Sequence, residues 1–169
     1  LGDPIDRSRP CFRVCLCACA ARTSLADEHR GKPGFIANES GSQLRLRLRL
    51  PRMASRGNGR GGASNATVHL GYLSSYENMG VASASCLSGC VCGRLILDGH
   101  RTGRRVSLEE LSPPLEVSRA RPEANASSSS WACTLAIEVL PQTSSGLHKV
   151  KLTSIATTVG ATGGLDLRA

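Results

Sequence analysis

Residues 68–92, VHLGYLSSYENMGVASASCLSGCVC, decide the fold class. The segment runs from strand-forming residues into a polar turn, then into a second strand and a cysteine cluster with the spacing Cys-x3-Cys-x-Cys. β-Branched and aromatic residues on either side of a polar turn are typical of neighbouring short strands. The segment therefore indicates a β-rich domain, but it points to no particular reaction.

The clearest strand lies upstream, at residues 43–50, QLRLRLRL, where leucine and arginine alternate strictly. Successive side chains of a strand point to opposite faces of a sheet. The alternation therefore predicts leucines on the core face and the three arginines Arg45, Arg47 and Arg49 on the outer face.

Other short segments with strand-forming composition follow, and turns rich in proline, glycine and serine separate them. Many short strands without an amphipathic helix favour an all-β fold, an antiparallel β-sandwich of jelly-roll-like type. The strands are predicted at Thr67–Leu73, Gly80–Cys86, Arg94–Leu97, Leu115–Ser118, Cys133–Leu140 and His148–Val159.

The sandwich domain is predicted to span residues 25–160, interrupted by a flexible Arg/Gly-rich loop at residues 51–65. Residues 1–24 are predicted to be a disordered, basic, Cys-rich segment, and residues 161–169 a frayed tail. Cys11, Cys15, Cys17 and Cys19 lie in the first of these segments, where a metal-binding tract and a segment foreign to the domain are both open interpretations.

Length and composition are consistent with one domain, since the chain has 169 residues of which 40% are apolar and only 3% aromatic. The core is therefore expected to be aliphatic. No run of about 18 apolar residues occurs, so no membrane insertion by this chain is expected. Because the chain begins with Leu1, we expect it to be a fragment of a longer protein.

The net charge of +8 is concentrated near the N-terminus. Residues 1–60 hold 12 basic and 5 acidic residues, whereas residues 61–169 hold 9 and 8. A groove for single-stranded nucleic acid pairs basic residues with aromatic stacking platforms, and the basic third has only Phe12 and Phe35. We therefore predict no nucleic-acid partner.

Four cysteines inside the predicted domain form an even set: Cys86, Cys90, Cys92 and Cys133. In an oxidising compartment they would form two disulfides, with three possible connectivities. Because one residue separates Cys90 from Cys92, we expect these two to pair outward, one of them with Cys133. Free buried thiols are one alternative, and zinc held by the clustered thiols with Cys133, His100 or His148 is another.

Three N-glycosylation sequons begin at Asn38, Asn65 and Asn125, each in or beside a predicted turn. Tyr76, Glu77, Asn78 and Trp131 are the candidates for sugar binding, because aromatic faces stack on pyranose rings while carboxylates and amides bond hydroxyls.

More ordinary roles compete with these site assignments. Tyr72 is predicted to be a core residue, and Tyr76 can anchor its own turn through its hydroxyl. His100 and His148 are predicted to be surface or strand-end residues. Lys149 and Lys151 are predicted to line the solvated face of a strand.

Three blocks in the same order resemble the C-terminal β-rich domain of uncharacterised plant and green-algal proteins, in which that domain follows an SGNH-type, esterase-like domain. The blocks are GKPGFIANESGSQLRL, VHLGYLSSYENMGVASASCLSGCVC and WACTLAIEVLPQTSSGLHKVKLTSIAT, within residues 27–157. The resemblance implies a sandwich fold and the secretory pathway, in the Golgi lumen or outside the cell.

The resemblance implies no catalysis by this chain. An SGNH enzyme needs a Gly-Asp-Ser block and a late Asp-x-x-His block, but here Pro4 follows Gly2-Asp3, and Asp98-Gly-His100 has the wrong spacing. We expect a non-catalytic accessory module without a cofactor, with a structural or interdomain role beside a neighbouring hydrolase-like domain. The alternatives are a carbohydrate-binding module for cell-wall or glycoprotein glycans and an intracellular zinc-binding domain.

Overall fold

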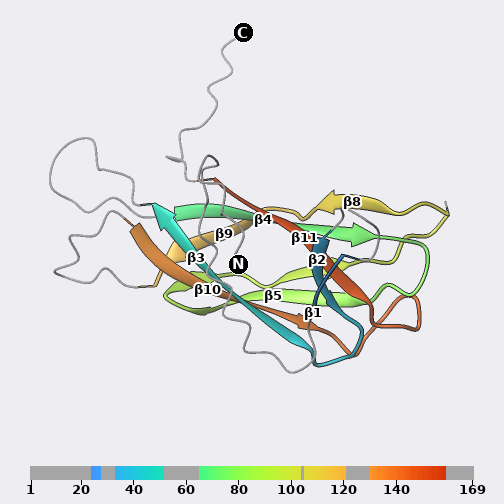
Figure 1. Cartoon of the computed structure of the whole chain (residues 1–169). Coiled ribbons are helices and arrows are strands. Elements are labelled where there is room, and N and C mark those ends of the chain that lie inside the picture. Colours follow the sequence, from blue (N-terminus) through green and yellow to red (C-terminus); the bar gives the residue numbers. More distant parts are fainter. Residues whose placement is uncertain (1–23, 28–32, 52–64, 104, 121–129, 159–169) are drawn as a thin grey trace, which may run out of the picture.

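The structure is a computed structural model that describes residues 24–27, 33–51, 65–103, 105–120 and 130–158 (Figure 1). Within these ranges the chain forms β-strands and no helix. Of the segments predicted to be disordered, flexible or frayed, residues 1–24, 51–65 and 161–169, all lie outside the described residues except Ser24, Pro51 and Asn65, which are the end residues of strands.

The strands form two antiparallel sheets. The smaller sheet has the order β3-β10-β5-β7, and the larger has the order β1-β2-β11-β4-β9-β6, with β8 also paired to β4. The prediction of an antiparallel β-sandwich is therefore confirmed. The strands are β1 (Ser24–Asp27), β2 (Pro33–Ala37), β3 (Gln43–Pro51), β4 (Asn65–Ser74), β5 (Val81–Ser88), β6 (Cys90–Cys92), β7 (Leu95–Asp98), β8 (Leu108–Leu111), β9 (Leu115–Arg119), β10 (Ser130–Val139) and β11 (Val150–Thr158).

The chain repeatedly crosses between the two layers. After the β1–β2 hairpin, every connection between described strands except β8–β9 leads from one sheet to the other. Consecutive strands therefore face one another across the core, and the two layers are visible in Figure 1.

Strand β3 has the predicted two-residue period. Leu44, Leu46, Leu48 and Leu50 are buried, at most 3% exposed, whereas Arg45, Arg47 and Arg49 are exposed. β3 pairs along its whole length with β10, from Pro51 opposite Ser130 to Gln43 opposite Glu138. The leucine row therefore covers one side of the core.

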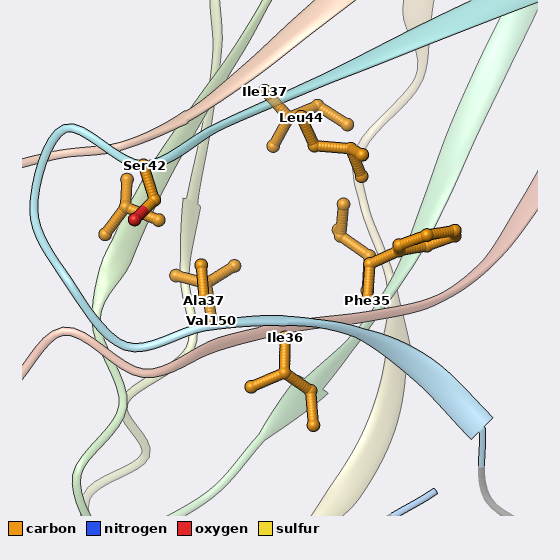
Figure 2. A pocket seen from close by; sticks show the side chains of 9 residues that line it. Phe35, Ile36, Ala37, Ser42, Leu44, Ile137 and Val150 are labelled. Atoms are coloured by element: carbon orange, nitrogen blue, oxygen red, sulfur yellow. The ribbon is translucent and has the colours of Figure 1, made fainter. Parts of the chain in front are cut away.

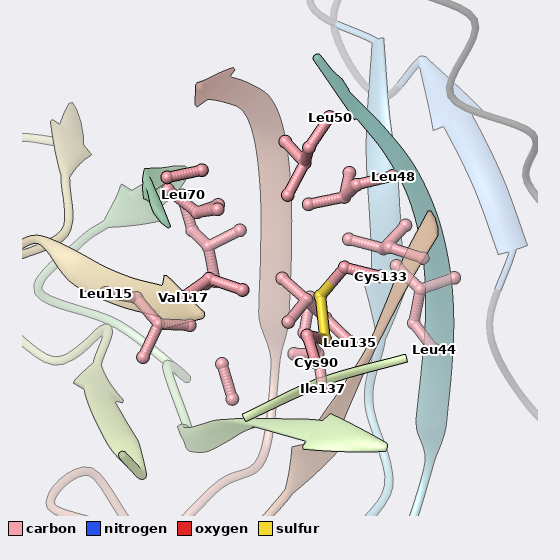
Figure 3. Close-up of a cluster of buried hydrophobic side chains, with 14 of the residues drawn as sticks. Leu44, Leu48, Leu50, Leu70, Cys90, Leu115, Val117, Cys133, Leu135 and Ile137 are labelled. Atoms are coloured by element: carbon pink, nitrogen blue, oxygen red, sulfur yellow. A yellow bond between two sulfur atoms is a disulfide. The ribbon is translucent and has the colours of Figure 1, made fainter. Parts of the chain in front are cut away.

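The core between the sheets is aliphatic, as the composition predicts. Figure 3 shows leucine, valine and isoleucine side chains from both sheets meeting around the Cys90–Cys133 disulfide. Leu50, Leu70, Val68, Val117 and Leu135 are completely buried. Such side chains contribute most of the hydrophobic stabilisation.

The strand predicted at Leu115–Ser118 is β9, whereas β8 was missed because its sequence, LEEL, has no clear period of two. Both strands pair with the same edge of β4. Between them, the Ser112 backbone N–H donates to the Leu70 carbonyl at 2.9 Å, and Ser112 Oγ accepts from Leu70 N at 3.0 Å. Pro113 and Pro114 follow without an N–H and end the pairing.

The prediction of a solvated lysine face on β11 is wrong for Lys151, which is only 4% exposed. A register irregularity between Leu152 and Ser154 breaks the simple alternation of β11. The aliphatic part of Lys151 occupies space left by Gly34 on β2, since a Cβ there would lie 2.9 Å from Lys151 Cε. Lysine stems often cover apolar surface in this way.

Candidate functional site

The chain changes sheet at a sharp corner between β5 and β6. Gly89 occupies this corner with a φ of 74°, in the left-handed region that favours glycine. A Cβ at residue 89 would also collide with the Ala132 carbonyl oxygen of β10. A glycine here therefore lets the backbone of β5 turn into β6 directly against β10.

Two disulfides flank this corner. Cys90 on β6 is bonded to Cys133 on β10, and Cys86 on β5 is bonded to Cys92 on β6. The Cα–Cα distances are 5.2 Å and 5.7 Å, respectively, well within the normal range for disulfides. Both bonds join the smaller sheet to the larger one.

The two disulfides differ in burial. Cys133 and Cys90 are 0% and 7% exposed and lie within the core, as Figure 3 shows. Cys86 and Cys92 are half-buried at its margin. The structure thus selects one of the three connectivities that the sequence left open.

The alternative prediction of a zinc site involves the sulfur atoms of the same cysteines. The sulfurs of Cys86, Cys90 and Cys133 lie within 4.8 Å of one another, and these residues are the group of three potential ligands found among the described residues. A zinc site needs thiolates. Because all four cysteines are disulfide-bonded here, zinc could be held only after reduction.

Replacement of Gly89 by alanine is expected to destabilise the fold by about 2–4 kcal/mol. The left-handed backbone costs an L-residue about 1–2 kcal/mol, and displacing β10 to relieve the collision costs roughly another 1–2 kcal/mol. Gly41→Ala is the matched control, since Gly41 has a φ of 79° but open space around a Cβ. Urea unfolding measures the free energy of unfolding of both variants. Equal losses of stability would show that the collision with Ala132 does not occur.

The β4–β5 turn contains three of the predicted sugar-binding residues. Tyr76 is half-buried, Glu77 and Asn78 are exposed, and Asn78 has a left-handed φ of 62°. The Asn78 carbonyl accepts a hydrogen bond from Lys149 N at 3.0 Å, and Gly80 N donates to the Lys149 carbonyl at 2.7 Å. The segment before β11 therefore fixes the backbone of this turn.

Trp131 does not join these residues. It lies on β10 opposite Leu50, at the end of the sandwich away from the β4–β5 turn, and is only 5% exposed. Phe35, Tyr72 and Tyr76 are half-buried. No aromatic residue in the described ranges is therefore exposed.

A polar group that the sequence analysis missed surrounds Tyr72. Its hydroxyl donates to Glu110 Oε2 at 3.3 Å, and Glu110 also pairs with Arg101. Burial raises the pKa of Tyr72 above its usual value, and the negative charge of Glu110 adds to the effect. Tyr72 is therefore a half-buried residue that packs against the core while its hydroxyl joins a polar network. No signal in the sequence links it to Glu110, because 38 residues separate the two.

The two histidines lie near this end of the sandwich. His100 and His148 are both half-buried, and neither Nδ1 atom has a hydrogen-bond partner among the described residues. The His100 backbone N–H donates to Asp98 Oδ1 at 2.9 Å, and Asp98 Oδ2 accepts from Ser144 Oγ at 2.5 Å. These contacts hold loops together, and no described nucleophile contacts either imidazole.

The sequons differ in exposure. Asn38 is exposed just before the β2–β3 turn, where a glycan has room. Asn65 is the half-buried first residue of β4, opposite Ser118. Asn125 lies outside the described residues.

A small cavity lies between β2, β11 and the end of β3 and β10 (Figure 2). Its volume is about 20 Å³, enough for roughly one water molecule and far below the several hundred Å³ of a ligand pocket. The lining is apolar except for Ser42, whose buried Oγ has no described partner. The cavity is therefore a packing defect rather than a substrate site.

When the sequence was compared with protein-family models and with curated proteins, neither comparison found a match. Within the described ranges, no helix has the length and apolar character needed to cross a bilayer.

Proposed function

We propose that the chain is a non-catalytic accessory β-sandwich module that packs against a neighbouring domain. The observation that carries the proposal is the character of its exposed apolar surface. All large hydrophobic side chains that are exposed in the described part are aliphatic: Leu87, Val91, Ile96, Val106, Leu108, Leu111 and Leu147. Glycan-binding surfaces use aromatic platforms, whereas domain interfaces accept aliphatic patches.

Three of these residues are close together in the chain, on or just before β8. Val106, Leu108 and Leu111 are 42%, 44% and 62% exposed, and we call them the β8 patch. Leu108 and Leu111 are three residues apart on β8, so they lie on opposite faces of the sheet and meet only at its free edge. A single exposed leucine is ordinary. Among the described strands, however, β8 pairs with β4 alone. The other edge of β8 therefore offers unpaired backbone groups beside the patch. An edge of this kind favours contact with another polypeptide surface.

The remaining features support a non-catalytic role. The cavity described above is too small for a substrate, and the histidines contact no described nucleophile. The resemblance to domains that follow an SGNH-type hydrolase supplies the expected neighbour. Disulfides and the exposed sequon at Asn38 support a secretory-pathway location.

Glycan recognition by the Tyr76 turn has less support. Glu77 and Asn78 are exposed and can bond sugar hydroxyls, but Trp131 lies buried at the opposite end. An intracellular zinc-binding role would require the reduced protein. We therefore prefer the docking module.

The test uses the full-length parent polypeptide with a protease site inserted before residue 25. After cleavage, the module is expected to co-elute with the preceding domain in gel filtration. Leu108→Ser with Leu111→Ser should release it, whereas Leu87→Ser with Leu147→Ser, at similar exposures of 50% and 52%, should not. Separation of the wild-type pieces on cleavage would rule out the docking role.

A further inference from the structure

The outer face of β3 presents a row of three arginines. Arg45, Arg47 and Arg49 are all exposed on the side opposite the buried leucines. Residues i and i+2 of a strand lie about 7 Å apart, so the three charges are spread over roughly 14 Å in a straight line. We call these residues the arginine row.

The strand beside the row leaves it uncovered. The residues of β10 opposite Arg45, Arg47 and Arg49 are Ala136, Thr134 and Ala132. Their side chains are short and uncharged; Ala132 and Thr134 are half-buried and Ala136 is buried. An extended ligand lying along β3 would meet only short side chains of β10 beside Arg47 and Arg49, whereas the exposed Glu138 lies beyond Arg45, opposite Gln43.

The charges of the row are not neutralised by the described part of the chain. Arg45 Nε donates to Gln43 Oε1 at 3.0 Å, which is a neutral partner. The ion pair formed among the described residues joins Arg101 to Glu110, away from β3. Arg47 and Arg49 are exposed and form no ion pair with a described residue, so their guanidinium groups are open to an anion from outside.

The position of the row also makes it accessible. β3 is an edge strand of the smaller sheet, as its place in Figure 1 shows. A guanidinium group matches the two oxygens of a carboxylate or related oxyanion with two parallel hydrogen bonds. A linear polymer that carries an anion on successive units fits such a row.

We propose that the arginine row binds a linear acidic polysaccharide bearing carboxylate or sulfate groups. Two other classes of polyanion fit less well. Single-stranded nucleic acid needs aromatic side chains for base stacking, and the neighbouring outer-face positions on β10 and β5 include Ala136, Ser83 and Ser85 instead. Membrane binding needs apolar side chains beside the charges, and β3 exposes none.

This activity is independent of the docking role, because the β8 patch belongs to the other sheet. A simpler explanation of the row exists. Charged side chains on an edge strand prevent edge-to-edge aggregation. The two explanations differ in what happens to polysaccharide affinity when the row is altered.

The test uses the full chain and two matched double variants. Arg47→Gln with Arg49→Gln removes two charges from the row, and Arg94→Gln with Arg105→Gln removes two exposed arginines elsewhere. Binding of labelled polygalacturonate and dextran sulfate is measured by fluorescence anisotropy at two salt concentrations. The row variant should bind about tenfold more weakly, and the control variant should stay within about twofold of wild type.

The two probes distinguish carboxylate from sulfate as the preferred anion, and neutral dextran should not bind. Equal losses in both variants would overturn the proposal, because binding would then follow only the net charge of +8. Tighter binding of oligothymidylate than of either polysaccharide would also overturn it. So would aggregation of the row variant with unchanged affinity.

A second measurement needs no variant. Phenylglyoxal modifies accessible arginines, and mass spectrometry reports the extent at each position. Bound polysaccharide should protect Arg45, Arg47 and Arg49 but leave Arg94 and Arg105 reactive. Uniform protection, or none at the row, would contradict the proposal.

Discussion

Loss of the Cys90–Cys133 disulfide is expected to destabilise the fold by about 4 kcal/mol, and loss of Cys86–Cys92 by about 2 kcal/mol. The difference follows from the length of chain that each bond closes, since the cysteines are 43 and 6 residues apart in sequence. A disulfide stabilises mainly by reducing the entropy of the unfolded chain, and longer loops lose more of it. The buried bond should therefore matter more.

The measurement compares two double variants by urea unfolding without reductant. One carries Cys90→Ala with Cys133→Ala, and the other carries Cys86→Ala with Cys92→Ala. Replacing both partners leaves no unpaired thiol of the pair to exchange with the other disulfide. Equal losses, or a larger loss for the short loop, would contradict the loop-closure argument. No change in either variant would mean that the bonds do not form in the folded protein.

The fold class could be predicted because its signals are local. The alternation of residues 43–50 determines which side chains of β3 point inward, whatever the rest of the chain does. The low aromatic content likewise predicted an aliphatic core. These features need no knowledge of which strands are neighbours.

The sequence predicted that one of Cys90 and Cys92 bonds Cys133, but not which, because that choice depends on the corner at Gly89. The corner places Cys90 on the larger sheet facing β10, so that Cys90, and not Cys92, meets Cys133. The sequence shows only that the two cysteines are separated by one residue. Which partner each cysteine bonds follows from the way the chain passes from β5 to β6 at this corner.

The predicted sugar-binding residues were chosen by residue type alone. The order of the strands places them at two different ends of the sandwich. Trp131 is the second residue of β10, whereas the Tyr76 turn follows β4, and these two positions lie at opposite ends of the sandwich. In a fold whose chain crosses between sheets at almost every connection, chemical type does not reveal which loops share an end. The hydrogen bond of Tyr72 to Glu110 could not be predicted either, because the sequence does not show that β4 and β8 are neighbours.

Leu135→Ala is expected to cost about 3–4 kcal/mol of folding stability. Leu135 is completely buried in β10, the strand that pairs with both β3 and β5. Deleting three methyl or methylene-sized groups there removes their transfer free energy and leaves a cavity. The neighbouring β-strands are fixed by backbone pairing on both sides, so they cannot move inward to fill it.

Leu147→Ala is the matched control, because it deletes the same atoms from a loop side chain that is 52% exposed. Its cost should remain within about 0.5 kcal/mol. Thermal and urea unfolding of the two variants measure the difference. Since Trp131 is the one aromatic residue among the buried core residues of the described ranges, each central leucine supplies a large share of the contact between the sheets. A loss at Leu135 below about 1 kcal/mol would mean that the sheets can slide together, and that the disulfides rather than the leucine layer set their spacing.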